Sequence, residues 1–219
     1  MKIIIIILLL GCFIQDVSAT AQIPDRLIYK GNTYHLHNNP LEVYFKENPR
    51  KRPEGDISST ALWRGYIATF EIKNQVLILI DLQIQVYEHQ EGKEAWRPNV
   101  ALKSVLTEVV PEGDTFKIDW CTEVLILPSG RLKNYVHRGY ASTYERYVLL
   151  EMKAGVLTQS KEFDHTAYLA FKKEQSERFK KTDAYQTYLI KWREKYDYTE
   201  EEIEEILEVN IFKYLDKFL

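Results

Sequence analysis

Hydrophobic and polar residues alternate along much of the chain before residue 164, which predicts strands. From Val76 to Val86 the even positions are all aliphatic, while the odd positions become polar toward the far end. A period of two residues turns successive side chains to opposite faces of a sheet. Residues 66–72 alternate in the same way, and Lys73-Asn74-Gln75 separates the two segments. We therefore expect a long antiparallel hairpin, with the even-numbered aliphatic residues on one face.

Shorter elements surround this hairpin. Turn residues, capping residues and prolines mark their ends. They are a hairpin over 25–37, a short helix capped by Asn39-Pro40, a helix opened by Asn99 and stopped by Pro111, and strands over 116–120, 124–127 and 131–136, the last two joined by a turn at Pro128-Ser129-Gly130.

The apolar period lengthens after Asp164, which can cap a helix. Apolar residues then fall on helical stripes, and Thr199 with Glu202 forms a capping box that opens a further helix. Residues 165–195 are predominantly basic and 196–219 predominantly acidic. This indicates neighbouring helices packed by complementary charge, with a binding surface as the alternative.

These patterns predict an α+β fold: a mainly antiparallel sheet followed by a C-terminal helical segment. We expect residues 22–163 to form the β-rich part with two short helices. Residues 164–219 should supply helices packed on the same domain.

The chain also contains an internal echo. Residues 64–71 and 138–145 share Arg, Gly, Tyr, Thr and Glu at matching positions, and residues 71–77 parallel 151–157 after a change of offset. The echo indicates a duplicated hairpin unit, and chance similarity between two strand–turn–strand segments is the alternative.

The first 21 residues have the pattern of a secretory signal peptide. Lys2 precedes an unbroken apolar run, and Ala19-Thr20-Ala21 places small residues where a leader peptidase cleaves. The run is too short for a transmembrane anchor. Leu9-Leu10-Gly11-Cys12 also resembles a bacterial lipobox, so a lipid anchor at Cys12 is the alternative. We expect a periplasmic or secreted protein, or alternatively an envelope lipoprotein.

Composition and charge narrow the function classes. The 219 residues are 45% hydrophobic, enough to build a substantial core, and the net charge of −3 argues against nucleic acid as a partner. Once the leader is removed, Cys121 is the remaining thiol, so no intramolecular disulfide can form. We expect Cys121 to be buried and inert.

Several segments resemble a family of exported proteins of Bacteroidota-type bacteria. They are Asn39-Pro40-Leu41-Glu42 with Tyr44-Phe45, the Arg52-Pro53 loop, residues 60–66 (TALWRGY) and residues 135–145 (YVHRGYASTYE). The family has no established activity, so the resemblance implies origin and export and transfers no catalytic residue.

The chain lacks the common nucleotide-binding, zinc-protease, Cys-x-x-Cys and serine-hydrolase motifs. His35 and His37 lie two apart in a strand, but two ligands do not make a metal site. We predict no catalytic residue, metal or cofactor.

The candidate ligand-binding residues cluster around the repeated Arg-Gly-Tyr segments. Large amphipathic rings, fixed charge and Gly-permitted bends occur there within a few residues, a mixture that binding pockets concentrate. They are Trp63, Arg64, Tyr66, His137, Arg138, Tyr140, Tyr144 and Glu145. Arg64 and Arg138 would hold an anion if they faced each other, and each would be structural if it bonded carbonyl groups instead.

We therefore expect an exported, non-enzymatic protein that binds a macromolecule, in the manner of an immunity protein or an assembly factor. The partner would be a protein or a glycan. The alternative is an enzyme or binder for an anionic or sugar ligand that uses the Arg-Gly-Tyr segments.

Overall fold

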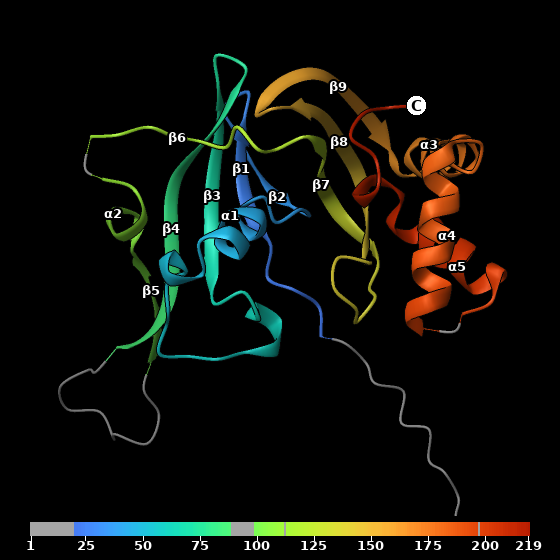
Figure 1. The fold of residues 1–219 in the computed structure, drawn as a ribbon. Coiled ribbons are helices and arrows are strands. Elements are labelled where there is room, and N and C mark those ends of the chain that lie inside the picture. Colours follow the sequence, from blue (N-terminus) through green and yellow to red (C-terminus); the bar gives the residue numbers. More distant parts are fainter. Residues whose placement is uncertain (1–19, 89–98, 112, 197) are drawn as a thin grey trace, which may run out of the picture.

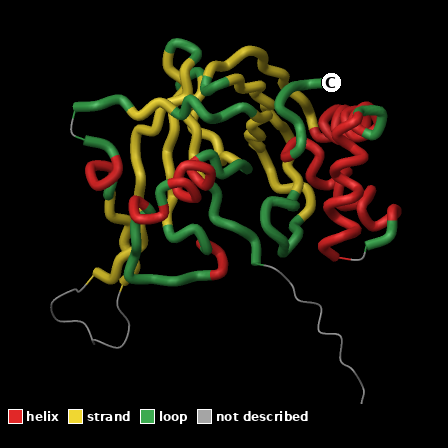
Figure 2. The backbone as a smooth tube through the Cα atoms, viewed as in Figure 1, coloured by secondary structure: helices red, strands yellow, loops and turns green. Residues whose placement is uncertain are grey.

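The structure is a computed structural model that describes residues 20–88, 99–111, 113–196 and 198–219. The signal-peptide and lipobox segments lie outside the described residues, apart from Thr20 and Ala21. Figures 1 and 2 show a curved sheet with helices against one part of it. The predicted α+β class, with a mainly antiparallel sheet and C-terminal helices, is confirmed.

Strands and helices occur in the following order. The strands are β1 (Asp25–Tyr29), β2 (Asn32–Leu36), β3 (Tyr66–Lys73), β4 (Val76–Glu88), β5 (Asn99–Ser104), β6 (Phe116–Lys117), β7 (Glu123–Asn134), β8 (Thr143–Lys153) and β9 (Val156–Asp164). The α-helices are α1 (Leu41–Glu47), α2 (Leu106–Val109), α3 (His165–Phe179), α4 (Asp183–Tyr196) and α5 (Glu200–Asn210), and the 3-10 helices are η1 (Pro49–Lys51), η2 (Thr60–Leu62) and η3 (Ile211–Lys213).

The sheet consists of two leaves. Its strand order is β2-β1-β3-β4-β9-β8-β7, with β5 and β6 also paired to β4, and β1–β3 is the parallel pair. Strands β4 and β9 pair only at Val76 and Val156. We call β1–β6 the first leaf and β7–β9 the second leaf. The two meet again where the backbone N–H of His37, just after β2, donates to the carbonyl of Ile126 on β7 over 3.0 Å.

Strands β7 and β8 of the second leaf are buried on both faces. Leu125, Val148 and Leu150 contribute to a core shared with the first leaf, α1 and α2. Their strand neighbours Val124 and Leu149 instead join a second core with α3, α4 and α5. Figure 1 shows these helices gathered beside the second leaf. The side-chain alternation of β7 and β8 thus fixes the helical segment to the sheet.

Helices α3 and α5 begin where the sequence predicts. The Asp164 carboxylate accepts a hydrogen bond from the backbone N–H of Ala167, and Thr199 with Glu202 forms the complete capping box. Among the described residues no helix is long and apolar enough to cross a bilayer.

The two hairpin tips, β3–β4 and β8–β9, meet in a locally twofold arrangement. The N–H of Leu77 donates to the carbonyl of Gly155 over 2.8 Å, and the N–H of Leu157 donates to the carbonyl of Gln75 over 2.7 Å. The two donors, Leu77 and Leu157, are 80 residues apart, and so are the two acceptors, Gln75 and Gly155. The same spacing relates residues 71–77 to residues 151–157. The Arg-Gly-Tyr halves of the echo are not equivalent, because Tyr66 begins β3 whereas Tyr140 lies in the loop before β8.

The prediction of a helix that begins at Asn99 is wrong for the first half of that segment. Residues 99–104 form β5, and they pair with Gln83–Glu88 at the far end of β4. Edge pairing with a long neighbouring strand outweighs the local capping pattern. The helix that follows, α2, is limited to four residues, and Val105 precedes it.

The prediction of a turn at Pro128-Ser129-Gly130 is also wrong. Strand β7 runs through these residues and continues to Asn134, with a register shift between Ser129 and Leu132. Pro128 is tolerated because β7 is an edge strand, and Gly130 adopts a φ of +77° at the irregularity.

The six even-numbered aliphatic residues of β4 do not share one face. Leu77 and Leu79 are buried in the first part of the strand, and Leu82 and Ile84 are buried in the second. A β-bulge opposite Thr69 and Phe70 causes the exchange. One extra residue reverses the faces of everything beyond it.

Gly155 is the position at which this fold should least tolerate a side chain. A Cβ atom there would lie 2.5 Å from the carbonyl oxygen of Ile118, and the φ of Gly155 is +74°. Gly31 has a φ of +77° but no atom within 4 Å of the same position. We expect Gly31→Ala to lower the free energy of unfolding by about 1–2 kcal/mol through backbone strain alone. Gly155→Ala should lower it by about 1–3 kcal/mol more, because backbone must move.

Urea denaturation of both variants measures the difference. Equal losses for Gly155→Ala and Gly31→Ala would contradict the close contact between the hairpin tip and the segment that follows β6.

Candidate ligand-binding site

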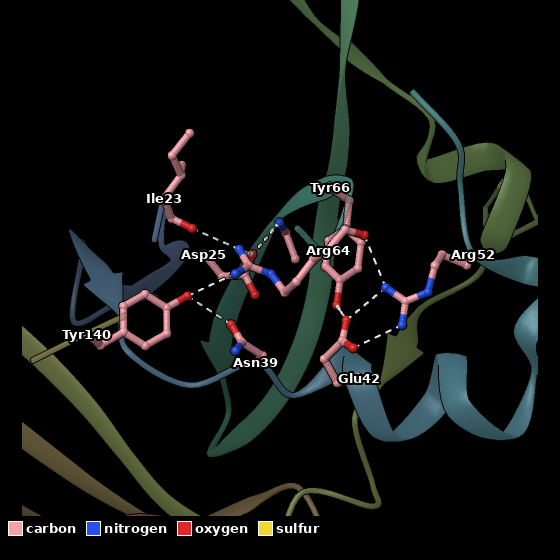
Figure 3. A network of polar contacts seen from close by, with 9 residues as sticks. Ile23, Asp25, Asn39, Glu42, Arg52, Arg64, Tyr66 and Tyr140 are labelled. Carbon is pink, nitrogen blue, oxygen red and sulfur yellow. Dashed lines mark hydrogen bonds and ion pairs between the residues drawn. The ribbon is translucent and has the colours of Figure 1, made fainter. Parts of the chain in front are cut away.

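Arg64 lies at the centre of a buried polar network. Its side chain has no exposed area, and its Nη2 donates to Asp25 Oδ1 over 3.2 Å and to the carbonyl of Ile23 over 2.9 Å. Its Nη1 donates to Tyr140 Oη over 3.0 Å (Figure 3). Asp25 Oδ1 also accepts from the backbone N–H of Ala68. The guanidinium therefore connects β1, β3 and the loop that precedes β8.

Burial dominates the electrostatics of this pair. It raises the pKa of Asp25 to about 6, although the charge of Arg64 acts in the opposite direction. Burial also disfavours the charged form of Arg64, but Asp25 and the hydroxyl groups of Tyr140 and Tyr66 together hold the Arg64 pKa above its ordinary value. The hydrogen bonds of the two terminal nitrogens offset much of the cost of burying this charge, whereas Arg64 Nε and Asp25 Oδ2 are buried without a partner among the described residues.

A second set of contacts extends the network to α1. Tyr66 Oη donates to Glu42 Oε1 over 2.8 Å, and Arg52 binds both carboxylate oxygens of Glu42 at 3.0 and 2.9 Å. Arg52 Nη1 also donates to the carbonyl of Arg64 over 3.1 Å (Figure 3). Arg52 thus connects Glu42, near the start of α1, to Arg64, which also binds Tyr140.

Asn39 does not act as the predicted helix cap. Helix α1 has no side-chain cap, and Asn39 Oδ1 instead accepts from Tyr140 Oη over 2.9 Å. Tyr140 therefore accepts a hydrogen bond from Arg64 and donates one to Asn39.

His37 and Asn38 close the junction between β2 and β7. The His37 ring stacks on Tyr140 at 4.7 Å between centroids and meets Tyr144 edge-on at 5.6 Å. Asn38 Nδ2 donates to Glu123 Oε2 over 2.8 Å, and the N–H of Ile126 donates to Asn38 Oδ1 over 2.8 Å.

A hollow of about 390 Å³ lies beside this junction. We call it the Trp63 hollow, since the Trp63 side chain on its wall is 58% exposed. Burial raises the pKa of the Glu123 carboxyl in its wall. Gln22 Oε1 is buried and has no hydrogen-bond partner among the described residues. The lining residues are Gln22, His37, Asn38, Asn39, Trp63, Glu123, Gly139, Tyr140 and Lys213.

The structure brings together some of the predicted site residues and separates others. Trp63 and Tyr140 line the hollow, and Arg64 and Tyr66 lie behind it in the buried network. Because the Arg64 side chain is fully buried, it has no surface on which to bind an anion jointly with Arg138.

The remaining four predicted residues lie outside the hollow wall. His137 and Arg138 are exposed, and Tyr135 Oη hydrogen-bonds His137 Nδ1 over 2.7 Å. Tyr144 contacts His37, and Glu145 pairs with Arg131 at 3.3 Å.

Several lining residues were not predicted. The run His37-Asn38-Asn39, which follows β2 and precedes Pro40, is the signal that could have found three of them. Nothing in the local sequence marks Gln22, Glu123 or Lys213. Lys213 comes from η3, so the C-terminal helical segment contributes to the hollow.

The histidine pair and the cysteine carry no evident chemistry. No cluster of three potential metal ligands occurs in the part of the chain that the structure describes. Cys121 is buried, as predicted, and burial raises the pKa of its thiol.

No family model, curated protein or solved structure matches this chain. The resemblance to exported Bacteroidota-type proteins stays a prediction.

His37 should make the folded protein sensitive to acid. Burial, followed by the charges of His35 and Lys213, lowers its pKa from 6.5 to about 3. The stabilisation by neutral His37 is complete above pH 6.5 and is lost as the pH falls toward 3. The slope is about 1.4 kcal/mol per pH unit, since the unfolded chain takes up the proton first. His37→Phe keeps a ring against Tyr140 and cannot be protonated, so its unfolding free energy should fall less steeply.

Urea denaturation at pH 6.5, 5.5 and 4.5 compares the slopes. The raised pKa values of Asp25 and Glu123 make the folded state more stable as the pH falls, which opposes the effect of His37. The wild type and His37→Phe share this contribution. His137→Phe, a change at an exposed position that does not act on the pKa of His37, is the matched control and should keep the wild-type slope. Identical slopes for wild type and His37→Phe would show that His37 is not buried in its neutral form.

Proposed function

We propose that this chain is an exported binding protein that takes a saccharide ligand in the Trp63 hollow. The observation that carries the proposal is an exposed indole beside a hollow walled by amide, hydroxyl and carboxyl groups. Binding sites characteristically combine an apolar surface with a few placed polar groups.

The side chains of the hollow suit a sugar. An indole that stays 58% exposed offers a flat face against which the C–H groups of a sugar ring can pack. The amides of Gln22 and Asn39 lie on the same wall, where they can exchange hydrogen bonds with ring hydroxyls. Gln22 Oε1 is buried and has no partner among the described residues, so a ligand hydroxyl that reached it would supply the missing donor.

The underlying network favours binding with little rearrangement. Tyr140 is fixed by Arg64 and Asn39, and Asn38 is fixed by Glu123 and Ile126. Binding groups held by their own hydrogen bonds lose less entropy when a ligand arrives.

Binding suits this hollow better than hydrolysis. Among the described residues that line it, Glu123 is the one carboxyl group. Most glycoside hydrolases use a pair of carboxyl groups that flank the scissile bond.

A protein partner is the second candidate function. It is favoured by the exposure of two large aromatic residues, Trp63 and Tyr135, each 58% exposed, since aromatic anchors are common at protein interfaces. Export through the leader over residues 1–21 suits either partner. A lipid anchor at Cys12 would place the same hollow at a membrane surface.

Trp63→Ala tests the saccharide proposal. Titration calorimetry against a panel of mono- and disaccharides should find ligands of the wild type. Loss of the indole should weaken them by about 30-fold or more, as expected for an anchoring aromatic residue worth about 2 kcal/mol. Tyr135→Ala removes an equally exposed ring that does not line the hollow, and should leave affinity unchanged.

Two results would contradict the proposal. One is a wild-type protein that binds no saccharide of the panel. The other is a Trp63→Ala variant that binds as well as the wild type. Capture of a protein partner that depends on Trp63 or Tyr135 would instead favour the second candidate.

A further inference from the structure

A second, smaller cavity adjoins the Trp63 hollow. It has a volume of about 80 Å³ and lies where the second leaf meets α3, α5 and η3. His37, Tyr140 and Lys213 line both spaces, so the cavity opens on the same junction. A water occupies roughly 30 Å³ in the liquid, so the cavity suits one small group rather than a sugar ring.

Two lysines on the cavity wall make it positive. Lys172 comes from α3 and Lys213 from η3. Neither forms an ion pair within 4.0 Å in the described ranges of the chain. The eight ion pairs between described residues involve other cations, so no carboxylate neutralises either lysine by direct contact; Lys172 is partly buried and Lys213 is exposed.

The lysines also repel one another. Burial and then the charge of Arg138 lower the pKa of Lys213, while Glu208 only partly offsets the burial and the Lys213 charge that lower the pKa of Lys172. Glu208 acts on Lys172 without forming an ion pair with it, and a group of positive charges with no carboxylate in direct contact favours an anion between them.

Polar groups around the lysines complete the wall. The cavity is also lined by Ser142, Thr143, Asn210 and the Tyr140 side chain. Hydroxyl and amide groups hydrogen-bond the oxygens of sulfate, phosphate and carboxylate, and lysine ammonium groups bind such anions as point charges.

We infer that this cavity is an anion subsite, and that the ligand of the Trp63 hollow is an acidic saccharide whose sulfate, phosphate or carboxylate group lies between Lys172 and Lys213. The inference rests on the proposed function for the sugar ring and adds the charged group. It also gives Arg138 a role: its exposed guanidinium adds to the positive potential at Lys213.

Titration calorimetry with matched sugar pairs tests the inference. Each neutral sugar of the panel is compared with its 6-sulfate, its 6-phosphate and its uronic acid at constant ionic strength, which also distinguishes the three anionic groups. We expect at least one acidic form to bind the wild type tenfold or more tightly than its neutral parent. Lys172→Met should abolish that preference. Lys173→Met, a change at the neighbouring exposed position of α3, should keep it.

Inorganic sulfate against chloride is the second arm, and it needs no sugar. Sulfate should bind the wild type and Lys173→Met but not Lys172→Met. If neutral and acidic sugars bind equally, the anion subsite is wrong while saccharide binding stands. If no sugar binds but sulfate binds through Lys172, the anion subsite stands and the saccharide proposal fails. If neither sugar nor sulfate binds, or if Lys172→Met and Lys173→Met behave alike, the inference is overturned.

Discussion

The rest of the structure depends on the burial of one arginine. Arg64 is charged and fully enclosed, so its donors require acceptors from the surrounding chain. Asp25, the carbonyl of Ile23 and Tyr140 accept from the two terminal nitrogens, and they belong to two separate segments, the entry to β1 and the loop before β8. The same contact that neutralises a buried charge therefore fixes the start of β1 and the loop before β8. The position of the Trp63 hollow follows from that arrangement.

Closure of the sheet supplies the remaining walls of the site. The leaves touch at the hairpin tips and again at the His37–Ile126 hydrogen bond, and the second junction lies under Tyr140. Because both faces of β7 and β8 are buried, the helices pack on the side away from the first leaf and bring Lys172 and Lys213 to the same loop. Two spaces of different chemistry, one aromatic and amide-lined and the other cationic, thus share His37, Tyr140 and Lys213.

The sequence predicts the fold class, the long hairpin and the capped helices, because these depend on local periodicity and capping groups. It also singles out Trp63, Arg64 and Tyr140. It does not show that Arg64 is enclosed, since burial of a charged side chain depends on acceptors that lie 39 and 76 residues away in the chain. The errors have the same origin. Pairing with β4 makes residues 99–104 a strand, and the Tyr140 hydroxyl takes the amide that would have capped α1.

The hydrogen bond between Arg64 and Tyr140 is the link between the core and the site, and a double-mutant cycle measures it most directly. Arg64→Lys keeps a positive charge beside Asp25, but a single ammonium cannot reach all three acceptors, and Tyr140→Phe keeps the ring stacked on His37. The account predicts that the two changes together reduce the free energy of unfolding by about 1.5–3 kcal/mol less than the sum of the single changes, as expected for a hydrogen bond to a charged group. Additive losses, within about 0.5 kcal/mol, would show that Arg64 does not hold Tyr140 in place.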